Sequence, residues 1–447
     1  MKQAASVKLV RVLSWLSAVI LLLVPFHAFL TVWLSSLTGH YTALRLWKEF
    51  LLVPIALGAL YILTRDRTLR GRLMSVWMVR LIAIYAVVLL VCGFGALASH
   101  TVSAKAMWYG LLVDARFLVF FLALMILAAK DDWLSRRWQK LLFIPAILVA
   151  AFAILQFLIL PYDFLKHFGY GDSTISPYET INHNIHRIRV ASTLRGANPL
   201  GAYLVLPISA AAVMFFKLRR QRWNLAMFGA GLLLALAFSF SRSAWIGAAA
   251  SLLLVAWLSF NSERVRKNIG WSLAGLLLAA TIFTYALRNN LAFENAVFHT
   301  DRNSKIAVSS NQGHSAAFKS AVKDIANQPQ GGGVGSAGPQ SVYNNHPARI
   351  AEDYYLQIGQ EAGVAGALVF IAICFAVAKQ LYGRRADRLA LALFASLIGI
   401  SLVNLLSHAW GDDTLAYVWW GFAGIYLGPA ILTDRHKQKN AKKVQSA

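Results

Sequence analysis

Residues 107–129 have the sequence MWYGLLVDARFLVFFLALMILAA, which indicates a membrane-spanning helix. A helix needs about 20 predominantly apolar residues to cross roughly 30 Å of hydrocarbon, and this stretch is long enough. Asp114 and Arg116 are the only charged residues in it. Charges at such depth usually pair with one another across a helix bundle, so we expect both to have partners inside the protein. The alternative is a role near a functional site.

Similar apolar stretches recur along the whole chain. They lie near 9–36, 47–64, 73–98, 141–161, 198–216, 223–240, 243–260, 268–287, 354–379, 387–407 and 414–432. With 58% hydrophobic and only 14% charged residues, the composition is that of a membrane protein. The first stretch exceeds the apolar core of a signal peptide, so we expect it to be retained. The pattern predicts an all-α polytopic membrane protein, with about 12 transmembrane helices in a single transmembrane domain over 1–447. Arg80, in the third stretch, is a further charge that should have a partner.

Lys and Arg residues are concentrated in alternate loops between these stretches. The clusters are RDRTLRGR at 65–72, KDDWLSRRWQK at 130–140, KLRRQR at 217–222, ERVRK at 263–267, KQLYGRRADR at 379–388 and RHKQKNAKK at 435–443. Because cytoplasmic loops carry an excess of Lys and Arg, we expect this face and both termini in the cytoplasm. The formal net charge of +24 then follows from topology, aided by anionic membrane lipids, and we expect no nucleic-acid partner.

Two loops on the opposite, exported side are long, at about 162–197 and 288–353. The second lies between the ninth and tenth stretches and contains GHSAAFKSAVKDIANQP, whose apolar residues recur at helical spacing. The glycine-rich turn QGGGVGSAGP follows and cannot continue a helix. We therefore expect a short amphipathic helix over the outer membrane face. Since long loops are uncommon unless functional, this loop should act as a lid over a site.

Arginines on the exported side are the candidate ligand-binding residues. In RIRVASTLRGANPLGAYLVLP at 187–207, Arg189 and Arg195 precede a helix that begins at Asn198-Pro199. The free amides of a first helical turn favour an anion, and Arg forms bidentate bonds to phosphate oxygens. Arg242 lies in a tight outer turn, SFSRSAWIG at 239–247. We expect the three arginines to bind the diphosphate of a lipid carrier. The alternatives are lipid headgroups or acidic loop residues such as Glu179 as partners, and snorkelling for Arg242.

Candidate general bases lie in HPARIAEDYYLQIGQEAGVAG at 346–366. Glu352 and Asp353 are adjacent acids at the start of the tenth stretch, and a carboxylate near arginines can accept a proton from a sugar hydroxyl. Equally, either acid can cap the helix start. His346 is a further candidate base, and Glu361 should face the protein interior. The sequence has no zinc motif, nucleotide-binding loop or nucleophile elbow, so we expect no metal and no cofactor.

At these segments the chain resembles the O-antigen ligase family, which includes lipid-linked glycan polymerases. The resemblance rests on RVASTLRGANPLGAYL, on SFSRSAWIG, and on AFKSAVKDIANQPQGGGVGSAGP followed by YYLQIGQEAGVAG, and covers about residues 185–370. It implies a GT-C-type, inverting, metal-independent glycosyltransferase in the bacterial cytoplasmic membrane. The implied donor is a glycan on undecaprenyl diphosphate, and the acceptor is a lipid core for a ligase or a second lipid-linked repeat for a polymerase. Arg189 and Arg242 would hold the diphosphate and stabilise it as the leaving group.

One departure from the family pattern concerns the base. Ligases usually have His-Asn where this chain has Glu352-Asp353. Glu352 would then replace the histidine, or His346 would approach from the loop. The difference favours a polymerase or a ligase for another surface glycan over a lipid A–core ligase. A transporter or flippase of an anionic solute is the alternative from another class, although no internal repeat typical of many such proteins is evident.

Overall fold

The computed structural model of the chain describes residues 2–181, 184–218, 222–260 and 310–445, together with 262–264, 267–268, 270–271 and 285–286. The first half contains α1 (Lys2–Leu23), η1 (Val24–Phe26), α2 (His27–Thr38), α3 (Tyr41–Arg45), α4 (Trp47–Arg65), α5 (Arg67–Ser75), α6 (Trp77–Ala98), α7 (Ala104–Lys130), α8 (Trp133–Leu158) and η2 (Phe164–Phe168). The second half contains β1 (Glu179–Ile181), β2 (Asn184–Arg189), α9 (Ala197–Lys217), α10 (Arg222–Phe238), α11 (Arg242–Ser259), α14 (Ser310–Asn327), η5 (Pro339–Tyr343), α15 (Tyr354–Tyr382), α16 (Arg388–Asn404), η6 (Ala409–Gly411) and α17 (Asp413–Gln445).

The helices are those of a polytopic membrane protein, as predicted. Within the described residues, eight are long and apolar enough to cross a membrane: Val7–Thr38, Trp47–Arg65, Trp77–Ala98, Ala104–Lys130, Trp133–Leu158, Ala197–Lys217, Arg242–Ser259 and Tyr354–Tyr382. Two further apolar helices, α10 and α16, are shorter. The stretch 268–287 and the loop segment 288–309 fall almost entirely outside the described residues. The count of 12 transmembrane helices therefore stays a prediction.

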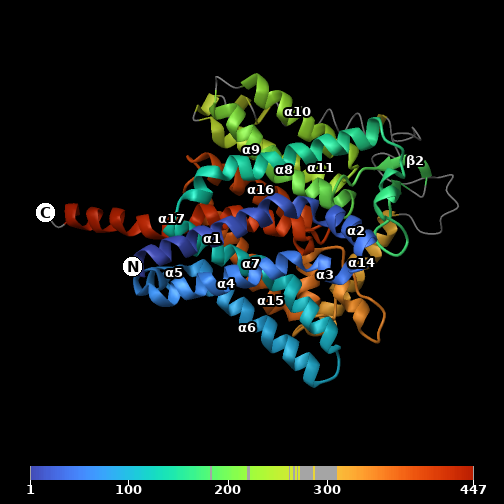
Figure 1. Cartoon of the computed structure of the whole chain (residues 1–447), viewed down its shortest axis with the longest axis horizontal. Helices are drawn as coiled ribbons and strands as arrows, with labels where there is room; N and C mark the ends of the chain where they lie inside the picture. Colours follow the sequence, from blue (N-terminus) through green and yellow to red (C-terminus); the bar gives the residue numbers. More distant parts are fainter. Residues whose placement is uncertain are drawn as a thin grey trace.

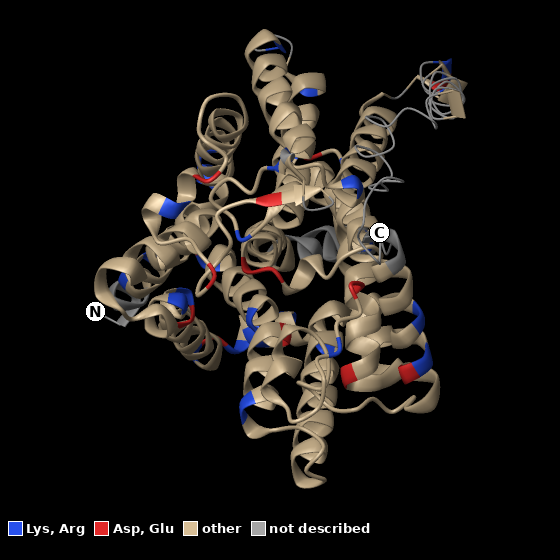
Figure 2. Ribbon diagram, turned by 90° about the vertical axis from the view of Figure 1, so that its right-hand side faces the viewer, with Lys and Arg blue, Asp and Glu red and all other residues tan. Residues whose placement is uncertain are grey.

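The molecule has two distinct ends. The N- and C-termini and the basic helix α5 lie at one end, and α2, α3, α14 and β2 lie at the other (Figure 1). Figure 2 views the end with β2, and most of its ribbon is tan because charged residues are sparse along the helices. A two-stranded antiparallel sheet, which the all-α prediction lacked, also lies at this end. In it β1 pairs with β2, with Glu179 opposite Arg189.

The centre of the bundle is α7, which packs along α17. Phe121 is fully buried, and its ring meets the Trp420 ring edge-on at 5.4 Å between centroids. The helices approach closely because α17 carries glycine at the contact, where a Cβ on Gly424 would lie 2.5 Å from the Phe121 carbonyl oxygen. Small residues allow the same close approach between many membrane helices. The contact of Gly247 in α11 with Gly399 in α16 is equally tight, and it fixes the helix that begins with Arg242.

The intramembrane residues Asp114 and Arg116 have partners inside the protein, but they do not pair with each other. Arg116 pairs with Glu49 at 2.9 Å and with Asp413, whereas the hydroxyl of Tyr354 donates to Asp114 at 3.5 Å. The two charges of α7 therefore belong to different networks. Arg80 is exposed, and its Nε donates to the Met74 carbonyl at 2.8 Å. The expectation of a partner within the bundle is wrong for Arg80, because it lies near the first turn of α6.

Candidate functional site

Arg189 is held at the end of β2 by three neighbours. Its Nη2 donates to Oδ1 of Asn198 at 2.6 Å, its Nε donates to the Ser239 carbonyl at 3.2 Å, and its Nη1 lies 3.5 Å from Oε2 of Glu179. Glu179 also accepts a hydrogen bond from the Ala197 amide at the start of α9. Burial lowers the pKa of Arg189, and the charge of Glu179 opposes that shift. The guanidinium is thus fixed in position, and the expected Glu179 contact is present.

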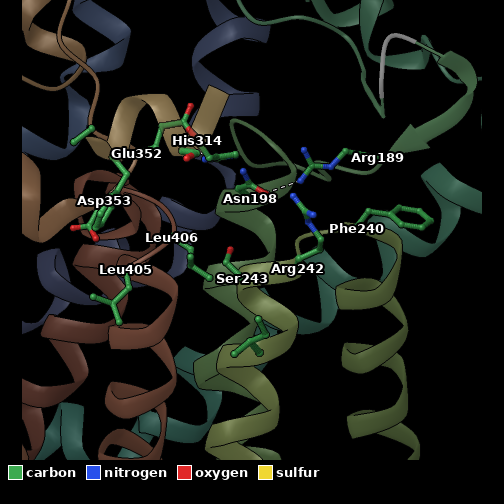
Figure 3. Close-up of a pocket in the computed structure, with 14 residues that line it drawn as sticks. Arg189, Asn198, Phe240, Arg242, Ser243, His314, Glu352, Asp353, Leu405 and Leu406 are labelled. Atoms are coloured by element: carbon green, nitrogen blue, oxygen red, sulfur yellow. Dashed lines mark hydrogen bonds and ion pairs between the residues drawn. The ribbon is translucent and has the colours of Figure 1, made fainter. Parts of the chain in front are cut away.

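Arg242 is the first residue of α11 and follows a tight turn from α10. Ser239 closes this turn, because its hydroxyl donates to the Leu236 carbonyl at 2.6 Å and accepts from the Ser241 amide at 3.2 Å. Phe240, at the corner, has a φ of 48°, which is uncommon for a residue with a side chain. The guanidinium groups of Arg242 and Arg189 lie side by side in Figure 3, within electrostatic range of each other.

The opposite wall carries an acid and a histidine. Glu352 has a φ of 55° and so is held in the left-handed region. Such strain persists only where the surrounding structure enforces it, and it is common at functional sites. Nδ1 of His314, on α14, is in hydrogen-bonding contact with Oε2 of Glu352. The His314 imidazole holds the pKa of Glu352 below its usual range, so that Glu352 is ionised at neutral pH.

Asp353 has a different environment from its neighbour. Its Oδ1 accepts a hydrogen bond from the Leu356 amide at 2.8 Å, which caps the N-terminus of α15. Burial raises the pKa of Asp353. The two adjacent acids that are equivalent in the sequence are therefore not equivalent in the fold.

These walls enclose a cavity of about 450 Å³. It is lined by Arg189, Asn198, Phe240, Arg242, Ser243, Ile246, His314, Ser315, Phe318, Ala351, Glu352, Asp353, Leu405 and Leu406. One side is cationic and the other carries the His314–Glu352 pair (Figure 3). Ile246, Leu405 and Leu406 line the cavity although each is half-exposed. Such an arrangement suits a ligand with an anionic head and an apolar tail.

Part of the chain that contributes to this cavity matches a known protein family. Residues 226–371 match the model of the family described as O-antigen ligase. This part of the chain is similar to that family. No match is found among curated proteins. The match supports an O-antigen ligase- or polymerase-type function in general, in membrane-bound polysaccharide biosynthesis.

The cavity brings together four of the six residues that the sequence proposed. Arg189, Arg242, Glu352 and Asp353 line it. Arg195 does not, and instead lines two neighbouring cavities. His346 lines none of these three, and its Nδ1 lies 3.0 Å from the Pro347 carbonyl oxygen.

His314 is the residue that sequence reasoning missed. It lies in the amphipathic segment that predicted α14, four residues before Phe318, and both side chains line the cavity. Residues four apart share one face of a helix. A histidine on the same face as the apolar residues was therefore a usable signal that this face covers a polar site.

Proposed function

We propose that this protein transfers a glycan from an undecaprenyl diphosphate carrier to an acceptor hydroxyl at the outer face of the bacterial cytoplasmic membrane. The observation that carries the proposal is the cavity with two arginines on one wall and the His314–Glu352 pair on the other. Both termini and the basic α5 lie at the opposite end of the bundle, which supports placing that end in the cytoplasm.

Arg189 and Arg242 bind the diphosphate. Two neighbouring cations repel each other, so an anion between them is electrostatically favoured. Asn198, Glu179 and the Ser239 carbonyl already hold Arg189, so little reorganisation is needed on binding. Charge-assisted bonds from a guanidinium to phosphate oxygens are short and strong. The same bonds stabilise the charge that develops on the diphosphate as it leaves.

The apolar side of the cavity accommodates the start of the polyprenyl chain. Ile246, Leu405 and Leu406 are 52%, 50% and 50% exposed, and they lie at the N-terminal end of α11 and just beyond α16. A carrier lipid that approaches from the bilayer would pass these side chains before its diphosphate reaches the arginines. Within the predicted loop 288–353, the helix α14 covers the site in this proposal, since His314, Ser315 and Phe318 line the cavity.

The His314–Glu352 pair activates the acceptor. Nδ1 is the imidazole nitrogen that faces the carboxylate, so it carries the proton and leaves Nε2 free to accept another. The acceptor oxygen then attacks the anomeric carbon as the bond from that carbon to the phosphate oxygen breaks. The bonding electrons leave with the diphosphate, and the hydroxyl proton passes to Nε2. A single displacement of this kind inverts the anomeric centre without a metal, in a GT-C-type site.

The acceptor distinguishes two versions of this reaction. A ligase transfers the glycan to another lipid or surface molecule, whereas a polymerase uses a second lipid-linked repeat. A flippase that uses the same arginines to bind an anionic solute is the competing class. We expect purified protein in sealed proteoliposomes to release free undecaprenyl diphosphate and to form a longer or newly attached glycan. Movement of the donor across the bilayer with no such product would contradict transfer and favour the flippase.

A further inference from the structure

A second cavity, of about 250 Å³, lies at the same end of the molecule and has a different character. Its lining includes Arg45, Tyr109, Arg195, Gln340, Gln357 and His408. A third cavity, of about 190 Å³, shares Asn198 with the diphosphate cavity and shares Arg195 and His408 with the second one. The third cavity therefore lies between the diphosphate cavity and the second cavity and adjoins both.

Polar atoms in the second cavity lack hydrogen-bond partners. Gln340 is 0% exposed and Gln357 is 2% exposed. Within the part of the chain that the structure describes, Oε1 of Gln340, Nε2 of Gln357 and Nδ1 of His408 have no hydrogen-bond partner. A buried polar atom left unpaired costs about 1–3 kcal/mol, so three such atoms on one wall require water or a ligand.

The neighbours of the two glutamines fix how they present these atoms. Nε2 of Gln340 donates to Oε1 of Glu361 at 2.7 Å, which leaves its Oε1 as the free acceptor. Gly338 lies against Gln357 with a φ of 70°, and a Cβ there would lie 2.5 Å from the Gln357 Nε2. Only glycine suits that conformation and leaves the amide its space. The lining thus offers an acceptor fixed by Glu361, Oε1 of Gln340, and a donor, Nε2 of Gln357.

His27, Arg116 and Asp413 line the cavity and belong to a network of paired charges that extends behind it to Lys48 and Glu49. Lys48 Nζ lies 2.8 Å from Asp413 and 3.1 Å from Glu49, and Arg116 pairs with both carboxylates. His27 Nε2 lies 3.3 Å from Asp413. These residues come from α2, α4, α7 and α17. Glu49 and Asp413 neutralise the charges of Lys48 and Arg116. This network therefore does not form a second anion-binding site.

The remaining lining has the chemistry of sugar recognition. The guanidinium of Arg45 lies over the Tyr109 ring, 5.3 Å from its centroid, so its N–H donors and the tyrosine hydroxyl are gathered at one place in the lining. Burial and the charge of Arg195 lower the pKa of His408, so its imidazole is neutral and can both donate and accept. Sugar hydroxyls likewise donate and accept hydrogen bonds.

We propose that the second cavity is a saccharide-binding subsite that holds a sugar residue of the glycan during transfer. The proposal rests on the proposed function. The sugar comes either from the donor, through the third cavity, or from the acceptor, and the chemistry of recognition is the same for both.

The test uses the full-length protein in nanodiscs and the variant Gln357→Met, which keeps side-chain length but removes the hydrogen bonds. Arg195→Ala is the second variant, since Arg195 is exposed and its loss should not affect folding. We expect either variant to raise the KM for one substrate about tenfold with little change in kcat. A rise for the glycan donor alone assigns the sugar to the donor, and a rise for the acceptor alone assigns it to the acceptor. Unchanged KM values for both substrates in both variants, with normal thermal melting, would overturn the subsite.

A binding measurement separates this proposal from the transfer reaction. The probe is the phosphate-free oligosaccharide released by mild acid from the donor preparation, compared with inorganic pyrophosphate. Gln357→Met should weaken oligosaccharide binding about tenfold and leave pyrophosphate binding intact, whereas Arg242→Ala should do the reverse. If wild-type protein makes no glycan product, the proposed function fails, and oligosaccharide binding still decides the subsite. Equal oligosaccharide binding by wild type and both subsite variants contradicts it.

Discussion

Replacement of Arg242 by alanine should nearly abolish glycan transfer while the protein remains folded. Arg242 begins α11 beside Arg189, and the proposed diphosphate lies between the two side chains. Arg189 is a poorer choice for this test, because its removal would leave Asn198 and the Ser239 carbonyl without their donor. Alanine has a helix propensity at least as high as that of arginine, so α11 should still form in Arg242→Ala, and an unchanged melting temperature checks this.

The magnitude follows from the hydrogen bonds that a guanidinium makes. A bidentate contact supplies two bonds to charged oxygens, each worth about 1.5–3 kcal/mol. Their loss raises the barrier by about 3–6 kcal/mol, and each 1.4 kcal/mol corresponds to a factor of about ten. We therefore expect kcat/KM to fall by about 10²–10⁴. Arg242→Lys keeps the positive charge but cannot form the bidentate contact, so its kcat/KM should fall by about 10–10².

The assay is release of undecaprenyl diphosphate from a purified glycan donor in nanodiscs, followed over time with the acceptor in excess. Arg70→Ala is the matched control, since Arg70 is an exposed arginine on α5 at the other end of the molecule. Control and variant should show equal yields and melting temperatures. Undiminished transfer by Arg242→Ala would remove this arginine from the mechanism and with it the proposed diphosphate site.

Three further predictions address the base and the rigidity of the second cavity. His314→Ala should lower kcat by about 10²–10⁴, because it removes the proposed base. The pKa of Glu352 should be higher in His314→Ala than in the wild type, since His314 no longer holds it down; an unchanged pKa of the Glu352 carboxyl in an infrared titration would contradict this pairing. Gly338→Ala should destabilise the protein by about 1–3 kcal/mol, because alanine is strained at a φ of 70° and collides with Gln357; a melting temperature equal to wild type would refute that. Lys48→Met should cost about 3–5 kcal/mol in unfolding free energy, because it breaks a buried charge network, and chemical denaturation in detergent measures it; a small loss would mean that the network is not rigid.

The sequence determined the class of the molecule and the bounds of most of its helices. An apolar run of some 20 residues must form a helix in a membrane, because each backbone polar group needs a partner within its own segment. The predicted stretches 107–129 and 354–379 accordingly fall within α7 and α15. The arginine segments were also visible in the sequence, since an exported arginine near an apolar run is costly without a partner.

The tertiary structure decided which side chains meet. Arg189 and Arg195 are six residues apart, yet the chain turns at Ser192, which has a φ of 54°, and the two arginines line different cavities. His314 meets Glu352 only because α14 packs against α15, and Lys48, Arg116 and Asp413 meet only because α4, α7 and α17 converge. Helix formation depends on neighbours along the chain, whereas these contacts depend on packing between distant segments. Hydropathy and charge spacing carry no record of that packing.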